Sequence, residues 1–186
     1  MVVRPPGRRG PNRTRFVVML VGLVVVGTGI VYGIHWLGHP WALALPGKPA
    51  LTGYWQGDVP YGSGDERHIV LHLTDDPPSA HDRCTTCPAL SGTATVCAGD
   101  RAERYELWGN PLNYLGSRFS LHTRSEAEGP GPRLNELHGE WEGDVIRVRT
   151  SLTRLDAAGA TVGSDSPPTT FEMSRADEAA FDAACR

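Results

Sequence analysis

The residues best suited to chemistry are four cysteines, Cys84, Cys87, Cys97 and Cys185. An even number of cysteines in an oxidising compartment predicts disulfide bonds, and four cysteines allow three pairings. The sequence does not choose among these pairings. If all four pair, Cys185 bonds to the 84–97 region and closes a long loop, worth about 4–5 kcal/mol in the chain-entropy model. We therefore expect structural disulfides that tie the C-terminus to the rest of its domain.

Two other uses of the cysteines stay open. Cys84 and Cys87 have the C-x-x-C spacing of a redox motif, but they lie in a Pro-containing loop rather than at the helix N-terminus that usually activates such a thiolate. Haem attachment requires a histidine directly after the motif, where the chain has Pro88. A zinc site would draw on His81 with Cys84, Cys87 and Cys97, although oxidation would remove the thiolates. We expect disulfides and no metal.

The histidines form no catalytic pattern. His68 and His72 are four residues apart on the polar face of one predicted strand, and His122 and His138 also alternate with polar neighbours. The sequence has no G-x-S-x-G, H-E-x-x-H, Walker or S-x-x-K motif. We therefore predict that the protein is not an enzyme and uses no cofactor.

The part of the chain that contains the cysteines follows a segment that is expected to span a membrane. Residues 16–34 are nineteen consecutive residues without a charge. At ~1.5 Å per residue such a helix spans about 28 Å, close to the ~30 Å hydrocarbon core of a bilayer. The sequence predicts a transmembrane helix over residues 16–37, with Tyr32, Trp36 and Trp41 at the outer interface.

The orientation of this helix follows from arginines. Five arginines and no acidic residue lie in residues 1–15, and the first charge after the apolar run is Lys48. The positive-inside rule puts this basic tail in the cytoplasm and the remainder outside. The run is longer than the apolar region of a cleaved signal peptide, so an uncleaved signal-anchor is favoured over cleavage. Lys48 is the only lysine in a chain rich in Ala, Gly, Pro and Arg, a composition typical of GC-rich bacteria. We expect the bacterial inner membrane, with the C-terminal domain in the periplasm or extracellular.

The rest of the chain is expected to be a linker, residues 38–50, and one extracytoplasmic β domain, residues 51–186. Beyond the membrane segment there are 13 basic and 21 acidic residues, a net charge of −8, which argues against nucleic-acid binding. Short apolar runs alternate with turn residues. We predict strands over residues 51–58, 66–74, 89–97, 101–108, 115–123, 133–142, 144–154 and 168–174. Short connections favour an antiparallel, up-and-down, eight-stranded barrel, because parallel strands need long crossovers.

The C-terminus changes from a two-residue to a helical period. Residues 176–185 are predicted to form one short helix, with Ser174 as the N-cap. Phe181 and Cys185 are four residues apart, so they share one face of this helix and are expected to pack on the barrel.

The first predicted strand contains Gly53-Tyr54-Trp55, which resembles the G-x-W signature on the opening strand of lipocalins and related calycin barrels. In that family the tryptophan closes one end of the barrel beneath an arginine from near the last strand. The resemblance implies that Trp55 pairs with Arg175, with Arg147 and Arg149 as alternatives. It also implies a barrel that binds a small apolar ligand inside.

Three functions are compatible with these features. The first is a membrane-anchored binding module whose barrel interior holds a small apolar ligand. The candidate interior residues are Trp55, Tyr105, Phe119, Trp141 and Phe171. The second is an envelope scaffold or protein-interaction domain whose bulky interior side chains fill the barrel. The third is a thiol oxidoreductase that uses Cys84 and Cys87.

Overall fold

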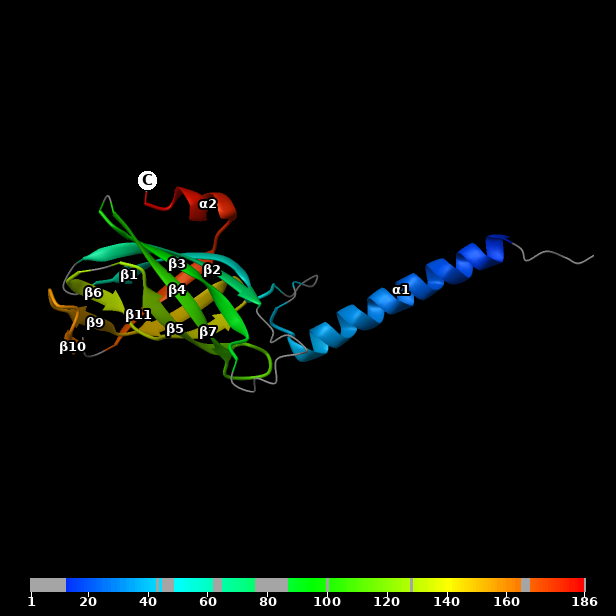
Figure 1. Cartoon of the computed structure of the whole chain (residues 1–186), viewed down its shortest axis with the longest axis horizontal. Coiled ribbons are helices and arrows are strands. Elements are labelled where there is room, and N and C mark those ends of the chain that lie inside the picture. The colour runs from blue at the N-terminus through cyan, green and yellow to red at the C-terminus, as the bar shows by residue number, and fades with distance from the viewer. Residues whose placement is uncertain are drawn as a thin grey trace, which may run out of the picture. The chain divides into compact units, whose positions relative to one another are not determined.

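A computed structural model of the chain (Figure 1) describes residues 13–42, 44, 49–61, 65–75, 87–99, 101–127, 129–164 and 168–185. The chain divides into two compact units, residues 1–38 and 39–186. The described residues of the first unit form one helix, and the second unit contains the β structure.

Helix α1 runs from Arg13 to Gly38. Its segment Phe16–Ile34 is long and apolar enough to cross a membrane, and none of it is buried by other parts of the protein. The β-branched residues that dominate this segment disfavour an isolated helix in water, but in lipid the backbone must satisfy its own hydrogen bonds. The apolar helix predicted over residues 16–37 is therefore present. A membrane anchor and a signal sequence both have this form.

Eight antiparallel strands form a closed barrel, as the alternating sequence pattern predicts. The barrel strands are β1 (Gly53–Pro60), β2 (Glu66–Asp75), β3 (Leu90–Ala98), β4 (Arg101–Pro111), β5 (Arg118–Ser125), β7 (Leu137–Glu142), β8 (Val145–Thr150) and β11 (Thr169–Arg175). Their order around the barrel is the order along the chain, and β11 closes the ring on β1. The up-and-down topology is confirmed, and no strand edge of the ring is left unpaired.

Because consecutive barrel strands run in opposite directions, their connections alternate between the two ends. The Trp41 end, defined by Trp41, residues 112–117 and the turn 143–144, holds the start of β1 and the end of β11. The opposite end holds Tyr61, Asp65 and residues 126–127 and 129–136. A second sheet, of order β10-β9-β6, leaves the barrel at this opposite end. Its strands are β6 (Gly131–Leu134), β9 (Leu152–Leu155) and β10 (Thr161–Ser164).

Two predicted strands were wrong in extent, because each is divided between the barrel and this second sheet. Residues 133–142 divide into β6 and β7, and residues 144–154 divide into β8 and β9. The chain turns out of the barrel at Asn135 and Ser151, where the Asn135 N–H donates to the Ser151 carbonyl over 3.0 Å. Leu134 and Leu137 are both buried although they are an odd number of residues apart. That break in the alternation is the sequence signal of the corner.

The core is a single cluster of side chains that line the barrel interior. Trp55, Ile69, Tyr105 and Leu121 have no accessible surface, and most of the other inward side chains expose 6% or less. Burying each large apolar side chain contributes about 1.5–3 kcal/mol. This layer is what holds the ring of strands closed.

Residues before the barrel also enter its core. Trp41 is only 3% exposed, so its predicted place at a membrane interface is wrong. The Leu51 N–H donates to the Trp41 carbonyl, and a Cβ on Gly116 would lie 2.4 Å from the Trp41 Cβ. Gly116 has a φ of +70°, which favours glycine. Leu115, which was expected inside a strand, instead lies exposed in the loop 112–117.

Helix α2 (Glu178–Ala183) follows the last strand and lies against the outside of β1 and β2. Its N-cap is Asp177, which accepts a hydrogen bond from the Ala180 N–H, and not Ser174. Ser174 still belongs to β11, because the ladders to β1 and β8 extend to it. Phe181 packs near the rings of Tyr54 and His72, and a disulfide joins Cys185 to Cys97 on β3.

Candidate functional site

The barrel interior contains the residues first considered as a ligand site. Trp55, Tyr105, Phe119 and Phe171 are buried, and Trp141 packs half-buried at the edge of the same cluster. A cavity wide enough for a water molecule would leave exposed area on the side chains around it. Because the exposed fractions are 0–6% for the four buried rings, the interior is packed with side chains.

Trp55 and Arg175 lie in the arrangement that the lipocalin resemblance implies. The Arg175 Cζ is 3.8 Å from the centroid of the Trp55 ring. The Arg175 Nη1 donates to the Thr52 carbonyl over 2.8 Å, and the Trp55 Nε1 donates to the Leu51 carbonyl over 2.9 Å. Burial lowers the pKa of Arg175, while Asp144 opposes this shift, and an arginine stays charged in either case. This pair stabilises the Trp41 end of the barrel.

A second polar cluster lies at the opposite end. The Arg67 guanidinium stacks 4.3 Å from the Tyr61 ring centroid, and Glu103 pairs with both Arg67 and Arg133 at 3.5 and 3.6 Å. The Tyr105 hydroxyl donates to Glu103 over 3.2 Å. Burial raises the pKa of both Tyr61 and Tyr105. Both phenols are therefore neutral at physiological pH, and bulky side chains occupy this end as well.

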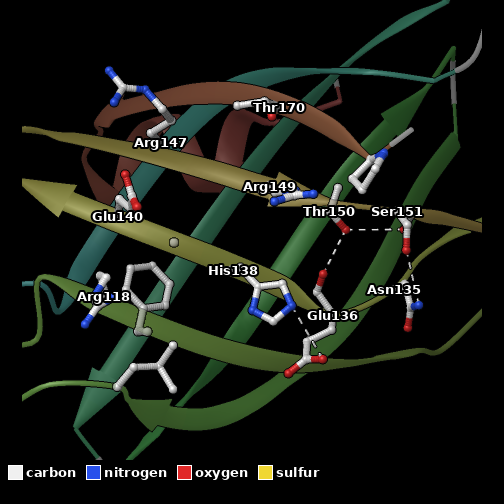
Figure 2. A pocket seen from close by; sticks show the side chains of 14 residues that line it. Arg118, Asn135, Glu136, His138, Glu140, Arg147, Arg149, Thr150, Ser151 and Thr170 are labelled. Atoms are coloured by element: carbon white, nitrogen blue, oxygen red, sulfur yellow. Dashed lines mark hydrogen bonds and ion pairs between the residues drawn. The ribbon is translucent and has the colours of Figure 1, made fainter. Parts of the chain in front are cut away.

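One hollow lies on the outer face of the barrel. We call it the outer groove. It has a volume of about 660 Å³, and its lining residues come chiefly from β5, β7, β8 and β11. Most of its side chains stand at alternate, outward-facing positions of these strands, and Figure 2 shows them around the groove. Part of its floor comes from Gly139, against which the Phe119 ring packs.

One row of side chains across the outer groove is balanced in charge. Strand register aligns Arg118 with Glu140, Glu140 with Arg147, and Arg147 with Glu172. Arg147 and Glu172 form an ion pair of 3.1 Å between two exposed side chains. Alternating charges on neighbouring strands attract each other, although exposed pairs contribute only about 0–1 kcal/mol each.

The next row is not balanced. Register aligns Ser120, His138, Arg149 and Thr170 on four adjacent strands. The row contains no carboxylate, and within the described part of the chain the Arg149 guanidinium forms no ion pair. Its neighbours supply further donors, the His138 ring and the Thr170 hydroxyl. This row can receive an anionic group from outside.

One carboxylate, that of Glu136, lies next to this row. Glu136 lies 3.6 Å from His138 and 3.9 Å from His122, and it accepts a short hydrogen bond from Ser120. Its backbone carbonyl accepts from the Thr150 hydroxyl over 3.0 Å, which holds the corner between the two sheets. Figure 2 shows Asn135 and Ser151 beside it. Glu136 therefore has several hydrogen-bonding neighbours, whereas Arg149 forms no ion pair with any residue that the structure describes.

The structure describes only some of the cysteines and histidines that the sequence suggested as sites. Cys97 pairs with Cys185, and Cys87 is disulfide-bonded, while Cys84 and His81 lie outside the described residues. His68 contacts Asp58 at 3.0 Å, and His72 stacks on Tyr54 with ring centroids 4.3 Å apart. These two histidines thus have separate partners on the barrel surface and do not act together.

Comparisons of the chain with protein-family models, curated proteins and solved structures find no match. The alternation in the sequence is typical of a polar strand face for His138, and for Arg147 and Arg149 beside Ile146 and Val148. It could not place them in one groove, because the register that aligns four strands depends on where each turn begins.

Proposed function

We propose that this protein is a membrane-tethered, non-catalytic interaction module of the bacterial envelope. Helix α1 is its uncleaved anchor in the inner membrane, the arginine-rich tail is cytoplasmic, and the barrel domain is outside. The barrel binds a partner protein through the outer groove, with Arg149 as the contact for an acidic side chain of that partner.

The packed barrel interior is the observation that carries this proposal. An interior ligand needs space that Trp55, Tyr105 and Phe119 occupy, each with 2% exposure or less. The outer groove instead offers an open volume and the guanidinium of Arg149, which forms no ion pair with any described residue. An arginine whose charge is uncompensated in the free protein gains more from a partner carboxylate than one that must first break an ion pair.

Two further features support the envelope location. The disulfide between Cys97 and Cys185 fits an oxidising compartment. The apolar helix has five arginines before it and no charged residue after it until Lys48, which fits a single-pass anchor with its N-terminus inside.

The resemblance to lipocalins supports a second candidate, an apolar ligand inside the barrel. The contact of Arg175 with Trp55 favours it. It would require the interior side chains to move apart, so it ranks below the outer groove.

Photo-crosslinking in intact cells tests the proposal. A photoreactive residue in place of Thr170 is expected to give one discrete adduct with a partner protein, and Arg149→Glu is expected to weaken that adduct at least fivefold. Arg104→Glu is the matched control, because Arg104 is an exposed arginine on β4 outside the groove. The proposal fails if Thr170 gives no adduct, or if both arginine variants weaken it equally. Displacement of an apolar dye by a lipid extract, with loss of dye binding in Phe119→Trp, would favour the interior ligand instead.

A further inference from the structure

Exposed apolar side chains of the barrel domain gather at one end. Five large hydrophobic residues of this domain are exposed within the part of the chain that the structure describes: Leu112, Tyr114, Leu115, Val145 and Val162. The first three lie in the loop 112–117, and Val145 directly follows the turn 143–144. All four are therefore at the Trp41 end. Only Val162 lies at the opposite end, on β10.

The loop that carries three of them is well ordered by its own hydrogen bonds. The Asn113 carbonyl accepts from the Gly116 N–H over 3.0 Å, and the Asn113 side chain donates to the Ser117 hydroxyl over 2.7 Å. The Leu112 N–H donates to the Arg118 carbonyl over 2.7 Å. Leu112, Tyr114 and Leu115 are nevertheless 58–61% exposed. The loop thus holds three large side chains outward, although nothing in its hydrogen bonding requires apolar residues there.

Chain length limits the distance between the end of the apolar segment and Trp41. Trp41 is buried in the barrel domain against Gly116 of the same loop. The apolar segment ends at Ile34. Four helical residues and three further residues span at most about 17 Å from there to Trp41. Headgroups occupy about 5–8 Å of that distance on each side of the hydrocarbon core.

We propose that the loop 112–117 inserts into the outer lipid interface, with Leu112, Tyr114 and Leu115 as the inserted side chains. Tyrosine and leucine suit this depth, because one end of tyrosine is apolar and the other accepts water or headgroup contacts. The exposed Glu142 and Asp144 of the neighbouring turn lie at headgroup level. Insertion is therefore driven by apolar burial and not by attraction to anionic lipid. This inference rests on the proposed membrane anchor and goes beyond it, since it fixes which end of the barrel faces the lipid.

Fluorescence quenching on the full chain in phosphatidylcholine vesicles tests this inference. A fluorescent amino acid replaces Leu115 in one sample and Val162 in the other, since both side chains are exposed to a similar extent, 58% and 64%. Lipids with a spin label near the headgroup are expected to quench position 115 at least threefold more than position 162, and aqueous iodide is expected to show the reverse preference. In a Leu112→Ser, Leu115→Ser variant, a fluorophore at position 114 is expected to lose at least half of its lipid quenching.

Vesicle flotation in the same samples separates the two proposals. If the chain does not float with the vesicles, the anchor fails. If it floats and positions 115 and 162 are quenched equally by lipid, the anchor stands and the loop inference is overturned. Protection of position 115 from iodide in cells, without quenching by lipid, also overturns it, because a partner protein would then cover the loop.

Discussion

The guanidinium carbon of Arg175, on the last strand of the barrel, lies 3.8 Å from the ring centroid of Trp55, on the first strand. These two residues are also opposite each other in the ladder that closes the ring. Arg175 adds a 2.8 Å hydrogen bond to the Thr52 carbonyl, just before β1. One side chain thus connects the start and the end of the eight-stranded ring, so its loss should affect the closure of the whole barrel.

Arg175→Ala is expected to destabilise the protein by about 2 kcal/mol, from the lost cation–π contact and the lost hydrogen bond to a partly buried carbonyl. Arg175→Lys should cost about half as much, because lysine keeps the charge but not the planar guanidinium. Urea unfolding of the full chain in detergent, followed by far-UV circular dichroism, measures both. Arg104→Ala, an exposed arginine on β4, should change the unfolding free energy by less than about 0.5 kcal/mol. Equal effects of Arg175→Ala and Arg104→Ala would contradict the closing role.

Gly139 is expected to tolerate no side chain. A Cβ there would lie 2.1 Å from Cζ of the Phe119 ring. Gly139→Ala should therefore cost about 2–3 kcal/mol through overpacking. In Phe119→Leu the smaller side chain leaves room, so the double variant should be more stable than the sum of the single effects predicts. The control is Gly163→Ala on β10, where a Cβ meets nothing within 4 Å. Strict additivity in the same urea series would show that the two residues do not pack as described.

The strand alternation predicted most of the barrel correctly, and physical reasons explain the rest. Ile69, Leu71 and Leu73 share one face in the sequence and are buried together in the structure. Period-2 patterning is dependable where one face of a strand is buried and the other is wet. It does not show where a strand leaves one sheet for another, because both halves of a bent strand still alternate. Residues 133–142 and 144–154 were expected as two strands for that reason.

The outer groove could not be predicted from the sequence, for a different reason. His138 and Arg149 alternate with apolar or small residues in the sequence, and both side chains are exposed in the structure. Their alignment with Ser120 and Thr170 depends on the register of three strand pairs, and a shift of two residues in one of these pairs can place Glu136, Glu140 or Glu172 in this row instead. Trp41 was misplaced because an aromatic residue after an apolar helix is typical of a membrane interface. Its burial and its contact with Gly116 show that it belongs to the barrel.

The disulfide between Cys97 and Cys185 predicts a specific peptide pattern. Its Cα atoms are 5.1 Å apart and 88 residues separate the two cysteines along the chain. In a non-reduced digest with trypsin and chymotrypsin, which cleaves after Leu90, the fragment with Cys97 should stay linked to the fragment with Cys185. Replacing both cysteines with alanine should lower the unfolding free energy by about 2–4 kcal/mol, below the chain-entropy estimate for such a loop. A link from Cys185 to the fragment with Cys87 would show a different pairing.

Alkaline pH should destabilise the barrel through its buried phenols. Burial raises the pKa of Tyr61 and Tyr105 in the folded state, whereas both ionise near pH 10 in the unfolded chain. Above pH 10 the unfolded chain therefore holds fewer protons than the folded protein, and the unfolding free energy falls as pH rises. The stabilisation is fully present below pH 10. Each phenol contributes a slope of at most about 1.4 kcal/mol per pH unit.

Tyr61→Phe is expected to reduce this alkaline slope and to leave stability at pH 7 within about 1 kcal/mol, since the ring and its contact with Arg67 remain. Urea midpoints of the full chain at pH 7, 10 and 11 measure the effect. Tyr114→Phe is the matched control, because Tyr114 is 61% exposed and the substitution removes the same hydroxyl from the surface. If both variants show the slope of the unmodified protein, ionisation of Tyr61 does not limit stability, and another group must be responsible for any loss above pH 10.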